Sequence, residues 1–117
     1  MAELSHLAAT GAEAVFCRQV AAFNARDIEQ YLATFAPDAV VHGVTEGLPL
    51  RGRDELRAHY SARLADPRLH CDVLEVLAWP GGWVLARERV TSSAGATDVT
   101  VMFAIVGGAI ARAFIGF

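Results

Sequence analysis

The residue of this chain best suited to acid-base chemistry is Glu88, which lies in a strand-like segment, 83–92. Because successive side chains of a strand point to opposite faces, Glu88 shares a face with Val84 and Ala86, and that face is the more apolar of the two. A carboxyl group inside an apolar pocket has a raised pKa and can act as a general acid or base. Glu88 is therefore the leading catalytic candidate, and the alternative that it pairs with an arginine such as Arg112 stays open.

The second catalytic candidate is His42, because an imidazole ordinarily titrates close to neutral pH. It lies in the β-branched run 39–44, where alternation places it on the face opposite Ala39, Val41 and Gly43. Two interpretations remain open for His42. It is either a base that acts in a pocket or a plain histidine of a surface or an interface.

Several large side chains could line a ligand cavity. The ligand-binding candidates among them are Tyr60, Trp79, Met102 and Phe114, with Arg112 as a charged candidate. Aromatic and methionine side chains on sheet faces also serve as ordinary core or interface residues, and this alternative applies to each of them. Trp79 and Trp83 flank a tight turn, so a rim or a dimer contact is equally open for them.

The composition is unusually apolar for a single domain of 117 residues. Hydrophobic residues make up 54% and charged residues 20% of the chain, against about 45–50% and about 25% in ordinary soluble domains. A large exposed apolar patch is a liability on a monomer, so the excess should line a pocket or cover a subunit interface. We expect a homodimer whose subunits each hold a small apolar molecule.

Charge and hydropathy argue against several classes of partner. The net charge is -3 and the ten basic residues, all arginine, are scattered, which does not suit a nucleic-acid partner. No segment approaches the roughly 18 uninterrupted apolar residues of a membrane span, and Met1–Glu3 lacks the basic start of a secretory signal. We therefore expect a cytoplasmic protein without a membrane partner.

The chain shows no pattern typical of a metal or cofactor site. Cys17 and Cys71 are too few and too irregularly placed for a disulfide framework or a CxxC metal site, so reduced structural cysteines are expected. The triplet His70-Cys71-Asp72 directs alternate side chains to opposite faces, and no phosphate loop or dinucleotide fingerprint is present. We expect neither a metal nor a cofactor.

Periodicity divides the chain into helices first and strands second. Capping-box patterns at Thr10–Glu13 and Asp27–Gln30 predict two helices, the second ending near Pro37, and Gly52 can cap a third that ends at Pro67. Strands are predicted over 39–44, 70–79, 83–92, 98–106 and 109–117, the last four joined by tight glycine-containing turns. This order predicts one domain over 1–117, with 1–9 as a loose or short helical lead-in. A layer of helices would close against one curved sheet and leave room for a small molecule.

Four short strings carry a resemblance to a known superfamily. They are Ala22–Ile28, Phe35–Val41, Leu50–Leu56 and, more weakly, Gly107–Ile110. Together with the order of the elements, they resemble the nuclear transport factor two-like superfamily, which includes SnoaL-like cyclases and steroid Δ-isomerase-like proteins. The resemblance implies an α+β fold, a cone-shaped shell of three N-terminal helices packed on a strongly curved, mainly antiparallel sheet.

The resemblance says more about the fold than about the activity. Alignment with the steroid isomerases of the superfamily places Gly43 where they carry the base, Gln19 where they carry a tyrosine donor and about Thr100 where they carry a protonated acid. None of these three catalytic residues is retained. Gln19 is a ligand-binding candidate through its position, and the acid and arginine sets of the related epoxide hydrolases and dehydratases are not found in a recognised order.

Two functions remain open at this point. The first is a cofactor-independent enzyme of the isomerase, cyclase or hydrolase-like kind, in which Glu88 or His42 transfers a proton on an apolar small molecule. The second is a non-catalytic ligand-binding or accessory dimeric module, which the missing acids favour. In either case we expect the dimer to form through the outer face of the sheet, where Trp83 and Leu85 lie beside Arg87.

Overall fold

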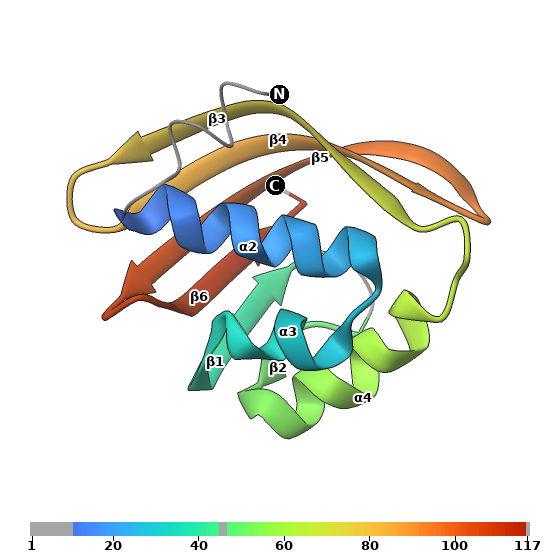
Figure 1. Ribbon diagram of the computed structural model, residues 1–117, viewed down its shortest axis with the longest axis horizontal. Helices are drawn as coiled ribbons and strands as arrows, with labels where there is room; N and C mark the ends of the chain where they lie inside the picture. The colour runs from blue at the N-terminus through green and yellow to red at the C-terminus, as the bar shows by residue number, and fades with distance from the viewer. Residues whose placement is uncertain (1–10, 45–46, 117) are drawn as a thin grey trace.

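The computed structural model describes residues 11–44 and 47–116, and these form three helices on one side of a single sheet. The helices are α2 (Gly11–Ala25), α3 (Ile28–Ala33) and α4 (Gly52–Leu64), and the strands are β1 (Phe35–Gly43), β2 (Leu50–Arg51), β3 (His70–Trp79), β4 (Trp83–Ser92), β5 (Gly95–Val106) and β6 (Ala109–Ile115). Figure 1 shows α2 along the concave side of β3, β4 and β5, with α3 and α4 beside β1 and β2. The predicted α+β shell of helices on a curved sheet is confirmed. The predicted lead-in 1–9 and the Thr10 cap lie outside the described residues.

The sheet has the strand order β2-β1-β6-β5-β4-β3. Every neighbouring pair is antiparallel except β1 and β6, which run parallel. The pairing register shifts once along each of the pairs β1–β6, β3–β4 and β5–β6. Such irregularities bend a strand and increase its twist, so they account for the curvature that makes one face of the sheet concave.

Local capping chemistry sets the starts of α3 and α4. Asp27 caps α3, and its Oδ1 accepts a hydrogen bond from the Gln30 N–H at 3.1 Å, as the sequence pattern predicts. The N-cap of α4 is Arg51 rather than the predicted Gly52, which is instead the first helical residue. The Arg51 N–H donates to Glu55 Oε1 at 2.8 Å, so a glutamate of the first helical turn binds the backbone of the N-cap residue.

Two other boundaries differ from the sequence-based prediction. Helix α3 ends at Ala33, well before Pro37, because Thr34 forms its C-cap. Strand β1 therefore begins at Phe35 rather than at Ala39, and Pro37 falls in the stretch of β1 where pairing with β6 is interrupted. The two-residue strand β2 was not predicted, since so short a segment has no periodicity to detect.

Aromatic side chains form the centre of the core between the helices and the concave face. Tyr31 packs against Phe35 and Tyr60, with ring centroids 5.3 and 4.8 Å apart. Phe16 packs against Phe103 with ring centroids 5.6 Å apart, and all five side chains are buried. Aromatic pairs at such separations each contribute about 0.5–1.5 kcal/mol beyond the burial of their surface. These contacts hold α2, α3 and α4 against the sheet.

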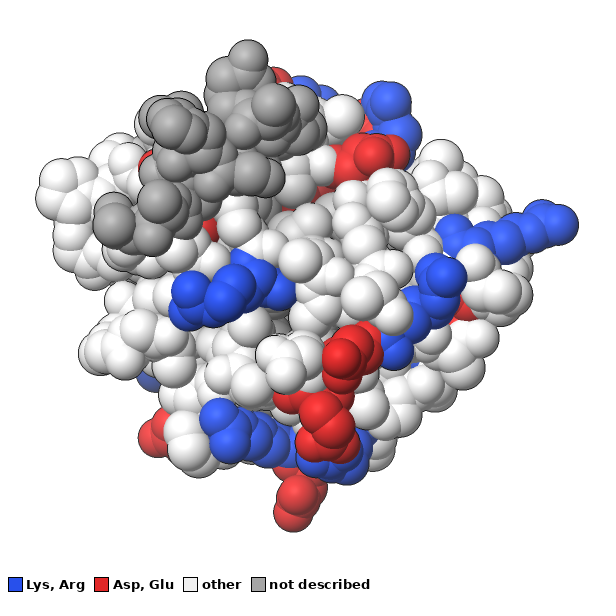
Figure 2. Space-filling model, viewed as in Figure 1, with Lys and Arg blue, Asp and Glu red and all other residues white. Residues whose placement is uncertain are grey.

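Charged side chains of both signs are interspersed on the surface. Three exposed ion pairs join Arg57 to Glu29, Arg87 to Glu75 and Arg89 to Asp98. On the face seen in Figure 2, arginines and acidic residues lie beside one another without a field of one sign. Among the described helices, none combines the length and the apolar character that crossing a membrane requires.

Two side chains at the end of α2 tie this helix to β3, which is an edge strand. Asn24 Nδ2 donates to the Cys71 carbonyl at 3.0 Å, and the Cys71 N–H donates to Asn24 Oδ1 at 2.7 Å. Arg26 Nη1 donates to the Leu69 carbonyl at 2.9 Å. An edge strand leaves backbone groups without a neighbouring strand, and the Asn24 amide satisfies two of them.

The substitution Asn24→Ala should lower the free energy of unfolding by about 2 kcal/mol, because it removes two hydrogen bonds and leaves partly buried Cys71 backbone groups without partners. Urea unfolding followed by circular dichroism measures this change. The exposed Gln30→Ala, whose side chain caps nothing, is the control and should change stability by less than about 0.5 kcal/mol. Equal stability of the two variants would contradict the prediction.

Candidate functional site

The helices and the concave face of the sheet enclose a cavity of about 720 Å³, a size typical of small-molecule sites. Its apolar wall includes Val20, Phe23, Val90, Val99, Val101 and Phe103. The mouth is marked by lining residues that are exposed, Ala62 and Arg63 at the end of α4 and Ala94 and Thr97 at the β4–β5 hairpin. The cavity therefore opens between α4 and this hairpin.

Glu88 is the acid of the cavity interior. Its side chain is 7% exposed and shares the concave face of β4 with the fully buried Val84 and Ala86, as alternation predicts. Burial disfavours the charged carboxylate and raises the pKa of Glu88 to about 7, although a hydrogen bond from the Cys71 thiol acts in the opposite direction. Arg112 lies on the other face of the sheet, so the alternative pairing of Glu88 with Arg112 is not formed.

The Cys71 thiol lies against the Glu88 carboxyl from the neighbouring strand β3. Burial raises the pKa of Cys71 far above its ordinary value, and the nearby Glu88 carboxylate raises it further. The thiol is therefore protonated at every physiological pH and acts as a weak donor to the carboxyl group rather than as a nucleophile. The two hydrogen bonds between Asn24 and the Cys71 backbone fix the strand at this point.

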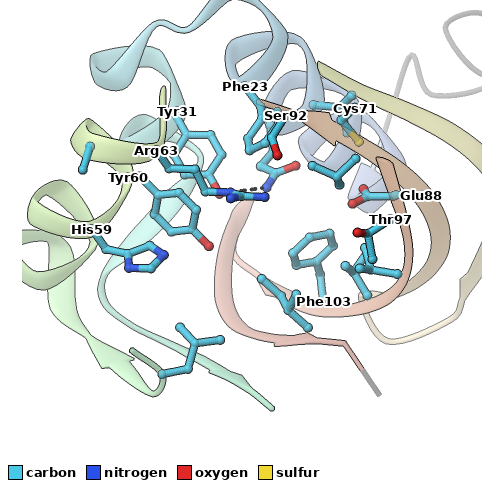
Figure 3. A pocket seen from close by; sticks show the side chains of 18 of the residues that line it. Phe23, Tyr31, His59, Tyr60, Arg63, Cys71, Glu88, Ser92, Thr97 and Phe103 are labelled. Carbon is cyan, nitrogen blue, oxygen red and sulfur yellow. Dashed lines mark hydrogen bonds between the residues drawn. The ribbon is translucent and has the colours of Figure 1, made fainter. Parts of the chain in front are cut away.

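Three further polar side chains form a group across the cavity from β4. Gln19 Nε2 donates to the Tyr31 hydroxyl at 3.2 Å, and both residues are buried. Tyr60 packs beside Tyr31, and Figure 3 shows its hydroxyl directed into the cavity. Burial raises the pKa of both tyrosines, so both hydroxyls are protonated and able to donate hydrogen bonds.

The mouth carries two basic side chains from α4. His59 and Arg63 are separated by one helical turn and both line the cavity. Burial and the charge on Arg63 lower the pKa of His59, so the imidazole stays neutral to lower pH than that of a free histidine. On the opposite side of the mouth, Ser93 N–H and Oγ donate to the two carboxylate oxygens of Asp66 at 2.8 and 2.6 Å. This contact joins the hairpin to the segment that follows α4.

The structure brings three of the predicted site residues, Glu88, Gln19 and Tyr60, together in this cavity. It places the others on the outer face of the sheet: His42, Trp79, Met102, Arg112 and Phe114. The structure does not place these five at the cavity, and the surface or interface alternative that was left open for His42 and the large side chains agrees with it. Strand register aligns each of the five with residues such as Trp83 and Leu85, whose side chains point away from the helices.

His42 illustrates the separation of the two faces. Its ring stacks on Phe114 with centroids 4.9 Å apart, and both residues line a small outer hollow of about 230 Å³ with Met102 and Val44. Its Nε2 is buried and has no hydrogen-bond partner among residues 11–44 and 47–116. His42 and Glu88 thus cannot act on the same bound molecule.

Most of the cavity lining was not predicted, including all its polar or titratable residues apart from Glu88, Gln19 and Tyr60: Tyr31, His59, Arg63, Cys71, Ser92 and Thr97. His59 and Arg63 could have been found from helical spacing, since they flank the predicted Tyr60 on the same side of α4. Cys71 required the strand register, which aligns it with Val90 beside Glu88. Within the described part of the chain, no group of three or more potential metal-ligating side chains gathers.

Glu88 should make the stability of the protein depend on pH. Its pKa of about 7 in the folded state lies above the 4.5 of a free side chain, so the folded protein keeps a proton that the unfolded chain releases between these values. The free energy of unfolding therefore falls by about 3 kcal/mol as the pH rises from 4.5 to above 7 and then levels off. Glu88→Gln should abolish this fall.

Urea unfolding at several pH values measures the effect as the difference between wild type and Glu88→Gln. The difference cancels the titration of groups that both proteins share, such as His59, whose lowered pKa acts in the opposite direction. Parallel stability profiles of the two proteins across this pH range would show that the carboxyl is not buried in its neutral form.

Comparison with solved structures supports the fold. A protein of Novosphingobium aromaticivorans, described as an uncharacterized cystatin-fold protein, is 22% identical, with a TM-score of 0.80 over 91% of this chain and 97% of that one. A Sinorhizobium meliloti protein named as a candidate polyketide cyclase is 27% identical, with a TM-score of 0.75 over 86% and 92%. A Catenulispora acidiphila protein with a ketosteroid isomerase-like fold, solved with trimethylamine, is 13% identical, with a TM-score of 0.76 over 88% and 84%.

Among curated proteins, none matches the chain significantly. A protein-family model does match it, and the match agrees with this fold. The model of the SnoaL-like domain matches residues 17–113, a span that includes most of α2, the other two helices and all six strands except the end of β6. The predicted resemblance to SnoaL-like proteins of the nuclear transport factor two-like superfamily is therefore confirmed, and the chain belongs to the SnoaL-like domain family.

Proposed function

We propose that this protein binds an apolar carbonyl compound in the cavity and that Glu88 transfers a proton on it without a cofactor. The observation that carries the proposal is a buried carboxyl group, with a pKa of about 7, that faces a cavity of about 720 Å³. A catalytic base is most effective when its pKa lies near the working pH, because it is then available without being too weak. Glu88 meets this condition through burial alone.

The tyrosine pair supplies the second part of the proposed chemistry. Removal of a proton next to a carbonyl group places negative charge on the carbonyl oxygen, and a fixed hydrogen-bond donor stabilises that charge. Tyr60 can donate from its hydroxyl in the cavity, while Gln19 and Tyr31 hold each other in place behind it. The proton taken by Glu88 could then be returned at another carbon, as in an isomerisation, or the carbanion could close a ring, as in a cyclisation.

The family supports this class of reaction without specifying the substrate. Relatives of this fold carry names such as polyketide cyclase and ketosteroid isomerase. The steroid isomerase arrangement itself does not suit this chain, because a side chain at Gly43 would collide with the backbone carbonyl of Ile115 and Thr100 lies on the outer face. Glu88 lies on β4 rather than on β1, where the steroid isomerases carry the base. We therefore propose a substrate whose proton is removed at a different position from that in the steroid substrates of those isomerases.

Glu88→Gln should lower kcat by at least about 100-fold on any substrate found by screening cyclic ketones and polyketide-like β-keto esters. In the wild type, kcat/KM should rise with pH and level off above about 7, because the ionised carboxylate is the base. The matched control is Glu29→Gln on α3, where an exposed Glu29 pairs with Arg57 away from the cavity and from the outer face of the sheet. His42→Ala should also retain activity. Turnover by Glu88→Gln at the wild-type rate would exclude this role.

A second candidate function is binding without chemistry. It is favoured by the observation that the described residues lining the cavity include a single carboxyl group, so no second acid is available to protonate a leaving group. The two functions are separated by incubating a ligand found by thermal shift with the protein and analysing it by mass spectrometry. Recovery of unchanged ligand after prolonged incubation favours the binding module.

We also propose that the working form is a homodimer that pairs through the outer face of the sheet. Leu77, Leu85, Met102 and Phe114 are aligned across β3, β4, β5 and β6 on this face. Beside them, Trp79 and Trp83 are 44% and 39% exposed, which is a large apolar area for the surface of a monomer.

Light scattering at micromolar concentration should give twice the 12.5 kDa of one chain. Leu85→Arg should shift the mass to that of a monomer, because it places an unpaired charge in the middle of the apolar row. The control Ala21→Arg alters an exposed alanine on α2, away from the outer face of the sheet, and should remain dimeric. A monomeric wild type would rule out this interface.

A further inference from the structure

The mouth of the cavity carries a positive charge that the proposed proton transfer does not use. Arg63, in the last turn of α4, is exposed and lines the cavity, and Figure 3 shows its side chain extending into the cavity from the side opposite Glu88. Among the described residues that line the cavity, Arg63 is the one arginine and Glu88 the one acid. The cavity is therefore polarised between its mouth and its interior.

The Arg63 guanidinium is available to a ligand. Five other arginines bind acidic side chains or backbone carbonyls: Arg26, Arg53, Arg57, Arg87 and Arg89. Arg63 makes no such contact with any residue that the structure describes. Its planar group therefore keeps five N–H donors free at the entrance to a cavity whose lining is mostly apolar.

The two ends of the cavity treat a negative charge differently. Next to Glu88, an anion would lose its hydration and would face a second acid, both of which are unfavourable. At the mouth, an anion would contact the guanidinium while remaining partly hydrated. Between the two ends, Phe23, Val101 and Phe103 offer only apolar contacts. A ligand that suits the mouth, the apolar middle of the cavity and the interior near Glu88 has one acidic end and an apolar body.

We propose that the ligand of this cavity is an amphipathic carboxylic acid whose carboxylate pairs with Arg63 at the mouth and whose apolar body extends toward Glu88. The inference rests on the proposed function, because it concerns the same cavity. A guanidinium offers two parallel N–H groups in the geometry that a carboxylate matches, and its single charge neutralises a monoanion. A phosphate dianion would need further cations, and the described lining residues do not supply them.

Three naphthalene probes test this proposal: naphthalene-1-acetate, naphthalene-1-acetamide and naphthalene-1-methylamine. They carry a carboxylate, an amide and an amine, respectively, on the same naphthylmethyl group. Equilibrium dialysis at pH 8 measures their dissociation constants, and at this pH His59 is neutral. Wild type should bind the acid more tightly than the amide. In Arg63→Gln, the preference for the acid over the amide should fall at least threefold, while binding of the amide itself stays within about twofold.

The control is Arg18→Gln, which removes the same charge from an exposed site on α2 that does not line the cavity. It should keep the wild-type preference for the acid. Circular dichroism confirms that both variants fold, which is expected because both arginines are exposed. A smaller fall in Arg63→Gln, or tightest binding of the amine to wild type, would overturn the proposal.

The binding measurement, taken together with the turnover of Glu88→Gln, separates this proposal from the proposed function. If the Arg63 effect is found and Glu88→Gln nevertheless turns over substrate normally, the carboxylate site stands and the catalytic role of Glu88 fails. If acid and amide bind equally while Glu88→Gln is inactive, the catalytic role stands and the carboxylate site fails. Absence of binding of all three probes at millimolar concentration would overturn both the ligand cavity and the site at its mouth.

Discussion

Burial of the Glu88 carboxyl is the constraint on which the rest of this site depends. A charged carboxylate in an apolar interior costs several kcal/mol, so the group remains protonated to near-neutral pH and the fold accepts a loss of stability above it. Among the described residues, no basic side chain pairs with the Glu88 carboxyl to offset this cost. The titratable group in contact with it is the Cys71 thiol, which is neutral. Structural acids are normally paired, and an unpaired one beside a cavity is typical of a functional site.

A cavity of this kind stays open only if the contacts between the helices and the sheet lie around its edges and side chains do not fill its interior. The fold does this with polar contacts at the edges, where Asn24 bonds to the backbone of the edge strand β3 and Asp66 binds Ser93 at the hairpin. The aromatic contacts of Tyr31, Phe35 and Tyr60 provide support at the other end. The space between these attachments is the cavity, and its lining is mostly apolar because the helices and strands facing it are amphipathic.

The curved sheet separates two surfaces with different side chains. Its concave face supplies Glu88 and the apolar wall of the cavity, whereas its convex face displays a row of apolar side chains with the stacked pair His42 and Phe114. The high apolar content of the chain is thus divided between a pocket and an outer face, as the composition suggests for a small domain. One strand, β4, contributes to both through simple alternation of its side chains.

The sequence by itself was sufficient for the fold class and for most helix and strand positions, and it made Glu88 the leading candidate for a buried acid while its pairing with Arg112 stayed open. These features depend on local patterns, namely capping boxes, glycine turns and the alternation of apolar residues, which a single segment contains in full. Only the tertiary structure decided which face of each strand lines the cavity. Trp79, Met102 and Phe114 are large and apolar in sequence, but their side follows from register shifts and from pairing between distant strands. In the same way, Cys71 lies beside Glu88 only because β3 pairs with β4, and Arg63 reaches the cavity only because α4 packs against β1 and β2. No local pattern specifies such contacts between distant segments.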